Sequence, residues 1–262
     1  MTENTKKGIR IAKVIAHAGY CSRREAEALI AEGRVQVNGV LIDTPATLIT
    51  DQAIKIDNKL LAQTNDIRLF LFHKPAGTIT TTKDPQDRRT IFELLPKNLP
   101  RLISIGRLDY NTEGLLLFTT NGDLARFIEL PKTKWIRKYR ARVFGHLNHE
   151  RLKKLENGIT IDGVRYGSIK VEIDVEKDSN SWLTISITEG KNREIRRVME
   201  ELGLKVNRLI RTSFGPFTLG KLGVGEIQEV TKTAIKNAID PLAFLLKLTV
   251  FHNILWITSV CY

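Results

Sequence analysis

One acidic side chain stands out in the stretch "GRLDYNTEGLLLFTT", residues 106–120. Asp109 follows the apolar segment "LISIG" and the basic Arg107, and it precedes the apolar run from Leu115 to Phe118. A loop braced by buried strands suits a reactive group, because catalysis requires the side chain to be held in one geometry. An aspartate in a loop can also simply cap the next turn. The stretch therefore predicts either a reactive carboxylate or a local turn.

Other kinds of chemistry find little support in the sequence. The segment "GPFTLGKL" has the glycine and lysine spacing of a phosphate-binding loop, but Leu222 stands where a Mg²⁺-binding Ser or Thr is required. We interpret it as a turn that joins two strands. The five histidines form no HExxH or comparable pair, so no metal site is expected. Any chemistry must come from ordinary side chains, without metal or cofactor.

The overall composition indicates a globular protein that binds polyanions. The chain has 262 residues, 42% of them hydrophobic, and carries a net charge of +12. Such a charge favours nucleic acid as a partner, because binding releases counterions from the phosphates. The two cysteines, Cys21 and Cys261, form no CxxC motif, and the first residues lack the apolar core of a signal peptide. We expect a reducing, cytoplasmic setting.

The amino-terminal segment, residues 1–62, predicts two short helices followed by a hairpin. Ser22 and Glu25 form a capping box at the start of the second helix, which we expect to run from about Arg23 to Glu32. Asn38 and Gly39 predict a tight hairpin turn within "VQVNGVLI". This order of elements resembles the alpha-L RNA-binding domain named after ribosomal protein S-four. Its basic face is the predicted RNA-binding surface, with a merely solvated face as the alternative: Lys6, Lys7, Arg10, Lys13, Arg23 and Arg24.

A change in composition after a polar connector, residues 63–68, marks the expected domain boundary. Residues 69–236 then alternate between strand and helix patterns. The expected strands are "LISIG", "GLLLFTT", "YRARVFG", "IKVEIDV" and "WLTISIT", and the expected helices are "HERLKKLENG" and "NREIRRVMEELG". The irregular spacing of the strands favours an α+β fold with a mixed, largely antiparallel sheet.

Several sequence blocks together resemble the RsuA/RluB family of ribosomal RNA pseudouridine synthases. The loop around Asp109 is similar to the family signature "GRLDxxTEGLLLLTNDG". The blocks "HKPAG", "KYRARVFG" and "EGKNREIRRVMEELGLKVNRLIRTSFG" follow in the family's order, so the resemblance covers about Ile9 to Lys236. The block "GKNREIRR" is similar to the branch that acts on large-subunit (23S) ribosomal RNA, and especially to the B-type enzyme.

The resemblance implies specific catalytic roles. Asp109 is implied to be the catalytic carboxylate, either as a nucleophile at the ribose or as a base that removes a sugar proton. Tyr139 is implied to stack beside the base, and Arg196 to pair with the aspartate. Arg107 is implied to fill the space that the flipped uridine vacates, with a phosphate contact as the alternative. Further basic residues are expected to contact RNA: Lys138, Arg140, Arg193 and Arg197.

The expected partner is ribosomal RNA, and we expect the protein to act as a monomer. A non-catalytic RNA-binding assembly factor is the alternative function, since the basic amino-terminal segment alone would support it. Residues 237–262 depart from the family and are strongly apolar. Lys247, His252 and Asn253 interrupt this run and disfavour membrane insertion. We therefore expect a loosely packed or locally helical extension without a membrane partner.

Overall fold

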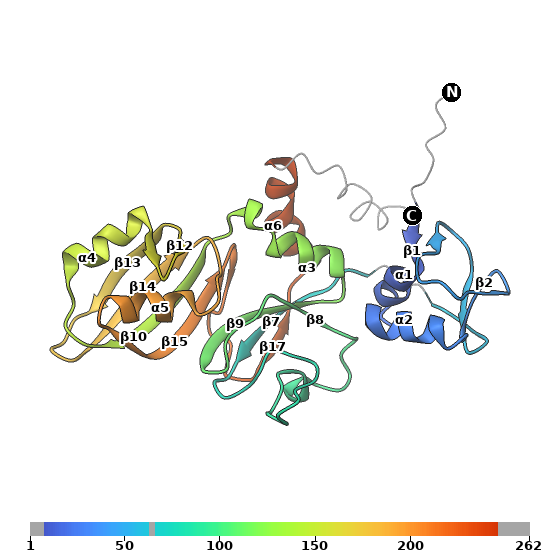
Figure 1. Ribbon diagram of the computed structural model, residues 1–262, viewed down its shortest axis with the longest axis horizontal. Coiled ribbons are helices and arrows are strands. Elements are labelled where there is room, and N and C mark those ends of the chain that lie inside the picture. Colours follow the sequence, from blue (N-terminus) through green and yellow to red (C-terminus); the bar gives the residue numbers. More distant parts are fainter. Residues whose placement is uncertain (1–7, 63–65, 246–262) are drawn as a thin grey trace. The chain divides into compact units, whose positions relative to one another are not determined.

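The computed structural model describes residues 8–62 and 66–245, with side chains described up to residue 240 (Figure 1). The chain divides into two compact units. Of the described residues, the first unit holds 8–62 and 66–67, and also takes in the short segments Asn98–Ile103 and Thr120–Gly122. The second unit holds the remaining described residues from Arg68 onwards. Each unit has its own sheet and is described separately.

The amino-terminal unit consists of two helices and short strands. The helices are α1 (Ile11–His17) and α2 (Arg23–Ala31). Four strands form an antiparallel sheet in the order β3-β2-β5-β6, with bounds β2 (Val35–Val37), β3 (Val40–Leu41), β5 (Ile54–Ile56) and β6 (Lys59–Leu60). A separate pair joins β1 (Ile9–Arg10) to β4 (Leu48–Ile49). A core of buried aliphatic side chains from both helices and the strands holds the unit together, including Ile11, Ile15, Ile30, Val35 and Ile56.

Local signals in the sequence of this unit are confirmed. The backbone amide of Glu25 donates to Ser22 Oγ at 3.2 Å, and the Ser22 amide donates to Glu25 Oε2 at 2.7 Å. This reciprocal bonding satisfies two free amides of the first turn of α2. The helix ends at Ala31, one residue before the expected end. Asn38 and Gly39 both have positive φ, 50° and 84°, as a tight hairpin turn requires.

The second unit is built on a nine-stranded sheet. Its strand order is β13-β14-β10-β15-β9-β7-β17, with β16 paired to β15 and β8 paired to β9. The parallel pairing is that of β15 with β9, and the other neighbours along this order run antiparallel. The strand bounds are β7 (Leu69–Lys74), β8 (Ile103–Ile105), β9 (Thr112–Thr119), β10 (Arg137–Phe144), β13 (Ile169–Val175), β14 (Asn180–Ile187), β15 (Lys205–Phe214), β16 (Phe217–Thr218) and β17 (Ile227–Glu229). The expected α+β fold with a mixed, largely antiparallel sheet is confirmed.

Helices and a small hairpin accompany this sheet. The helices are α3 (Gly122–Glu129), α4 (His149–Lys154), α5 (Glu194–Glu201) and α6 (Lys232–Leu245), and the hairpin joins β11 (Ile159–Ile161) to β12 (Val164–Tyr166). Three short 3-10 helices are η1 (Phe92–Leu94), η2 (Pro131–Thr133) and η3 (Leu155–Asn157). Figure 1 shows α4 and α5 with the part of the sheet formed by β13, β14, β10 and β15. The expected helix over "HERLKKLENG" is split into α4 and η3.

The segment that imitates a phosphate-binding loop is a turn between strands. Gly215 and Pro216 connect β15 to β16, and Gly215 has a φ of +54°. A Cβ atom at Gly215 would overlap the indole ring of Trp135, so the glycine allows the ring to pack against the turn. The interpretation of this segment as a turn joining two strands is confirmed.

The carboxyl-terminal helix crosses the expected end of the second domain. Helix α6 continues past Lys236 to Leu245, and the side chains of Ile235 and Ile239 are buried. Residues up to at least Ile239 therefore contribute to the core of the second unit. The rest of the expected apolar extension, residues 246–262, lies outside the described residues. In the ranges that the structure does describe, no helix is both long enough and apolar enough to cross a membrane.

Candidate active site

The carboxylate of Asp109 is available for chemistry. Asp109 is half-buried in the loop between β8 and β9, and its backbone carbonyl accepts a hydrogen bond from the Thr112 amide at 3.0 Å. Among the described residues, no hydrogen bond or ion pair engages its side chain. A capping aspartate would use its carboxylate to bind a backbone amide. The geometry therefore disfavours the capping role and leaves the carboxylate free to meet a ligand.

A buried lysine fixes the loop that carries this carboxylate. Lys74, the last residue of β7, is fully buried, and its ammonium group donates to the carbonyls of Pro75 at 3.0 Å, Tyr110 at 3.3 Å and Thr112 at 2.9 Å. Two of these carbonyls belong to the residues that follow Asp109 in the loop. Burial lowers the pKa of Lys74 to about 8, although the negative charges of Asp109 and Glu113 favour its charged form.

Neighbouring segments add further anchors to the same loop. Thr80 Oγ1 donates to the carbonyl of Leu108 at 2.9 Å, immediately before Asp109. The amide of Gly77 donates to the carbonyl of Tyr110 at 2.9 Å, immediately after it. Both donors come from the segment that follows "HKP" in the sequence. The backbone on each side of the aspartate is therefore held while its side chain stays free.

The sheet register brings Tyr139 into line with this loop. One row across four strands contains Lys74 on β7, Gly114 on β9, Arg211 on β15 and Tyr139 on β10. Tyr139 is 8% exposed and Arg211 is 3% exposed. Strand β9 begins at Thr112, directly after the aspartate loop, so this row lies at the end of the sheet where Asp109 stands.

Close backbone contact makes this row possible. Gly114 has a φ of +102°, and a Cβ atom there would overlap the backbone of Arg211. The Arg211 side chain donates from Nε to the carbonyl of Leu115 at 2.7 Å, while its Nη2 is buried without a hydrogen-bond partner. A buried guanidinium group with an unused donor is costly unless a ligand or water satisfies it. Arg211 is thus a functional candidate that the sequence analysis did not single out.

Arg196 contacts the aspartate loop through backbone atoms, not through the expected ion pair. Its Nη1 donates to the carbonyl of Val206 at 2.8 Å, and its Nη2 donates to the carbonyl of Asn111 at 3.1 Å. Within the described part of the chain no ion pair of 4.0 Å or less joins Arg196 to Asp109, so the expected direct pairing is wrong for this structure. Burial and the charge of Arg193 lower the pKa of Arg196, while the charge of Asp109 opposes that shift. The two groups therefore interact through space.

An ion pair stiffens the start of β9. The Arg208 guanidinium donates to both carboxylate oxygens of Glu113, from Nε at 2.9 Å and from Nη2 at 2.8 Å. This bidentate contact lowers the pKa of Glu113. Glu113 therefore pairs across the parallel contact between β9 and β15 and is not merely an exposed side chain.

The predicted RNA-contact residues of this unit lie on different surfaces. Arg107, Arg193 and Arg197 are exposed. Lys138 and Arg140 are also exposed, but they alternate with Tyr139 along β10 and therefore point to the opposite face of the sheet. Arg140 forms an ion pair with Asp174 at 3.4 Å and lies over the ring of Trp182 at 4.6 Å. The structure does not bring Lys138 and Arg140 together with Tyr139.

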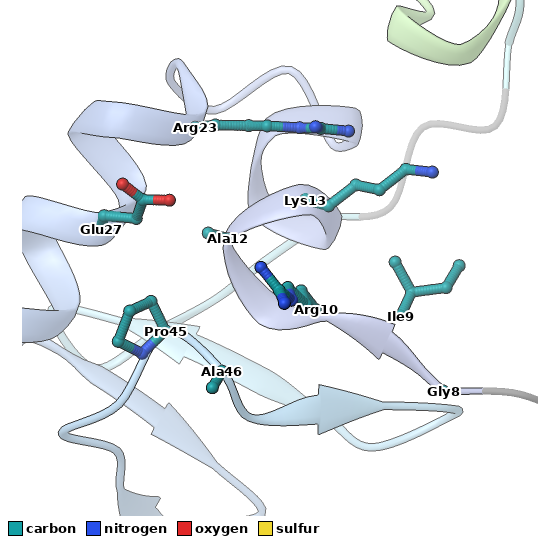
Figure 2. Close-up of a pocket in the computed structure, with 9 residues that line it drawn as sticks. All are labelled: Gly8, Ile9, Arg10, Ala12, Lys13, Arg23, Glu27, Pro45 and Ala46. Atoms are coloured by element: carbon teal, nitrogen blue, oxygen red, sulfur yellow. The ribbon is translucent and has the colours of Figure 1, made fainter.

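The amino-terminal unit contains a basic pocket. Its volume is about 450 Å³, and Figure 2 shows the residues around it: Gly8, Ile9, Arg10, Ala12, Lys13, Arg23, Glu27, Pro45 and Ala46. Three of the predicted RNA-binding cations thus line one pocket, with Glu27 as the acidic residue among them. Arg24 is exposed but is not part of this lining, and Lys6 and Lys7 lie outside the described residues. The pocket fits a polyanion better than a neutral ligand.

Ligands for a metal ion are not gathered anywhere in the described ranges. No group of three or more His, Cys, Asp or Glu side chains there could hold one. The arrangement around Asp109 thus consists of a free carboxylate, a buried tyrosine and buried cations that hold backbone carbonyls.

Comparisons with known proteins agree on a family. The sequence pattern described as "RNA pseudouridylate synthase" matches residues 68–201, and the pattern described as "S4 domain" matches residues 9–54. An "Uncharacterized RNA pseudouridine synthase" of Rickettsia bellii (strain RML369-C) is 49% identical over 228 residues, covering 87% of this chain and 99% of the relative.

A further relative and a solved structure extend the comparison. A "Ribosomal large subunit pseudouridine synthase B" of Yersinia pestis is 38% identical over 221 residues, covering 82% of this chain and 70% of the relative. A solved structure, "Crystal structure of pseudouridylate synthase", matches with a TM-score of 0.62 and 27% identity, covering 87% of this chain and 98% of that one.

Proposed function

The chain belongs to the RNA pseudouridylate synthase family and is an RNA pseudouridine synthase with an S4 domain; from this premise we propose that it modifies large-subunit (23S) ribosomal RNA, with Asp109 as the catalytic carboxylate. The observation that carries the catalytic part is the free Asp109 side chain in a loop whose backbone is held on both sides. The ribosomal substrate is supported by relatives named "Ribosomal large subunit pseudouridine synthase B", which are 38–39% identical.

The reaction fits a site without metal or cofactor. Pseudouridine formation breaks the bond from the sugar carbon to the base nitrogen and rejoins the turned base through a carbon atom. No atoms enter or leave, so a single carboxylate suffices. In our proposal Asp109 acts on the ribose, either as a nucleophile that forms a covalent intermediate or as a base that removes a sugar proton.

The residues around Asp109 receive roles that follow from their contacts. A uridine within stacked RNA must leave the stack to reach the loop, at a cost of a few kcal/mol. We assign to Tyr139 the stacking contact with the flipped base; the row of the sheet that Tyr139 shares with Arg211 and Gly114 supports this role. Arg196 holds the Asn111 carbonyl, and the charge of Asp109 favours the charged form of its guanidinium group. Arg107 is exposed next to Leu108 and Asp109, where it can fill the vacated space in the RNA.

RNA also binds through the S4 domain. We assign phosphate contacts to Arg10, Lys13 and Arg23, which line the basic pocket shown in Figure 2. Phosphate contacts hold the RNA in register and contribute affinity that depends on salt. In this arrangement the S4 domain supplies binding affinity for RNA, while the second unit carries out the reaction.

Replacing two pocket arginines should reduce the salt dependence of RNA binding. For the double variant Arg10→Gln, Arg23→Gln we expect the slope of log K against log salt to become shallower by about 1.5, because each lost phosphate contact removes released counterions. Filter binding with a large-subunit ribosomal RNA transcript measures the slope. The control Lys55→Gln removes an exposed cation of the same unit outside the pocket and should leave the slope unchanged. An unchanged slope for the double variant would show that the pocket is only a solvated surface.

The proposed substrate is tested by mapping pseudouridines. Ribosomal RNA from cells with and without the gene is compared position by position. We expect one or more pseudouridines of large-subunit RNA to be missing without the gene. A complete set of pseudouridines in both samples would contradict the proposed substrate, and a change confined to small-subunit RNA would reassign it.

A further inference from the structure

A buried carboxyl group at the start of α5 has one oxygen without a partner. Glu194 is 3% exposed. Its Oε2 accepts a hydrogen bond from the Lys191 amide at 2.9 Å, and its own amide donates to the Lys191 carbonyl at 3.2 Å. Oε1 is buried and has no hydrogen-bond partner. A charged carboxylate with an unpaired oxygen in such a place carries a large desolvation cost.

The neighbouring carboxyl group of Glu189 provides an acceptor for a proton on Glu194. Glu189 Oε1 accepts from the Gly167 amide at 2.7 Å, and Oε2 accepts from Lys191 Nζ at 2.6 Å. Lys191 holds both carboxyl groups, because its amide donates to Glu194 and its ammonium donates to Glu189, so the two groups are anchored to one residue. Two ionised carboxylates can only accept, so they can bond to one another only when one of them is protonated. A proton on Glu194 turns the unpartnered carboxyl group into a donor.

The surrounding charges favour Glu194 as the protonated member. Burial, together with the negative charge of Glu189 and the bond to it, raises the pKa of Glu194 to about 7 against the effect of Lys191. Burial also acts to raise the pKa of Glu189, but the Lys191 ammonium and the Gly167 amide lower it below its ordinary value. The other groups that face the pair are Arg137 on β10, whose pKa responds to the charge of Glu194, and Tyr166 on β12, whose ring lies 5.7 Å from Lys191 Nζ.

The turn that Glu194 closes also carries an exposed arginine. Arg193 precedes α5 in the left-handed conformation, with φ 51° and ψ 29°, which costs energy for a residue other than glycine. The turn from Lys191 to Glu194 holds it there. The charge of Arg193 lowers the pKa of Arg196, so the two guanidinium groups lie near one another. A change in the turn therefore moves one arginine and alters the electrostatic environment of the other.

We propose that Glu189 and Glu194 share one proton and that this acid pair positions Arg193 for RNA binding. This inference rests on the proposed function and on the RNA contact that the sequence predicts for Arg193. Both glutamates are positioning residues, because neither side chain reaches the aspartate loop in a described contact. The ammonium of Lys191 completes the arrangement by linking Glu189 to the carbonyl of Arg165 at 2.6 Å.

The direction of the pH dependence follows from the raised pKa. The folded protein binds this proton more tightly than the unfolded chain, in which the pKa is near the ordinary 4.5. The stabilising contribution is therefore fully present below about pH 4.5 and is lost as the pH rises through about 7. Above that pH two carboxylates face one another, the turn loosens, and RNA affinity falls.

The variant Glu194→Gln tests the pair directly. Its amide is a permanent donor to Glu189 and keeps an oxygen for the Lys191 amide. We measure the Kd for a large-subunit ribosomal RNA transcript from about pH 5.5 to about pH 8.5, with thermal unfolding without RNA over the same range. We expect the Kd of the unmodified protein to rise about tenfold across this range, the loss of one charge-assisted contact. Glu194→Gln should keep the tight Kd throughout.

Two further variants separate positioning from damage to the fold. Glu200→Gln changes an exposed acid of the same helix and should follow the unmodified protein. Glu194→Met keeps most of the side-chain volume but lacks a donor and should bind RNA weakly at every pH, so tight binding by the glutamine variant alone shows that the donor is required. Parallel pH profiles for the unmodified protein and Glu194→Gln, in unfolding or in binding, would overturn the proposal. Unfolding needs no RNA, so its outcome is independent of which RNA is the substrate.

Discussion

Asp109→Asn should abolish pseudouridine formation while RNA affinity and thermal stability change little. Asparagine has nearly the same shape as aspartate, and no described contact engages the Asp109 side chain, so the loop loses no hydrogen bond. The substitution removes the negative charge and the nucleophilic or basic oxygen that the reaction requires. Release of tritium from RNA labelled in its uridine bases measures turnover, and filter binding measures affinity.

A matched control makes this result specific. Asp162→Asn changes another loop aspartate, exposed and in the left-handed conformation that asparagine also tolerates, and should leave turnover unchanged. If Asp109 only capped a turn, asparagine would replace it as a cap, so both stability and turnover would be retained. Substantial turnover by a folded Asp109→Asn protein would remove Asp109 from the mechanism.

Local features of the structure could be predicted because their causes lie within a few residues. The Ser22 and Glu25 capping box and the turn at Asn38 and Gly39 depend on backbone groups next to them in the sequence. Strands with alternating or continuous apolar residues were recognisable for the same reason, as in β10 and β9. The position of Asp109 between two strands follows from this pattern and is confirmed.

Features that depend on packing between distant parts of the chain could not be predicted from the sequence. The burial of Lys74 requires β7 to lie beside β9, and the orphaned oxygen of Glu194 requires the packing of α5 against the sheet. The family resemblance suggested an ion pair between Arg196 and Asp109. In the structure the Arg196 side chain instead donates hydrogen bonds to two backbone carbonyls. The expected helix "NREIRRVMEELG" begins two residues late, because Arg193 takes the left-handed conformation.

Strand alternation separates two of the expected RNA contacts from Tyr139. Lys138 and Arg140 are its neighbours in sequence, but successive side chains of a strand point to opposite faces. Lys138 and Arg140 lie on the face of the sheet opposite to Tyr139. Charge density along a sequence is therefore a weaker guide to a binding surface than the face on which each charge lies.

Lys74→Met should lower turnover about 100-fold and destabilise the protein by about 1–3 kcal/mol. Methionine fills the buried volume but cannot donate to the carbonyls of Pro75, Tyr110 and Thr112, so each carbonyl loses one hydrogen bond. The Asp109 loop loses its main anchor, and a small displacement of a catalytic group costs much of the rate. Tritium release and thermal unfolding measure the two effects. The control Lys83→Met removes an exposed lysine and should change neither.

The pH dependence distinguishes this anchoring role from simple packing. The pKa of Lys74 lies at about 8, below its usual 10.5, so the folded state binds the proton less tightly than the unfolded chain. Its contribution to stability therefore increases as the pH rises from about 8 to about 10.5. Turnover should instead fall as the pH rises above about 8, because the neutral amine of Lys74 has two N–H donors for three carbonyls and holds the loop less firmly. If turnover of the unmodified protein and of Lys74→Met falls in parallel above pH 8, Lys74 serves as a space-filling residue and the aspartate loop is positioned by other contacts.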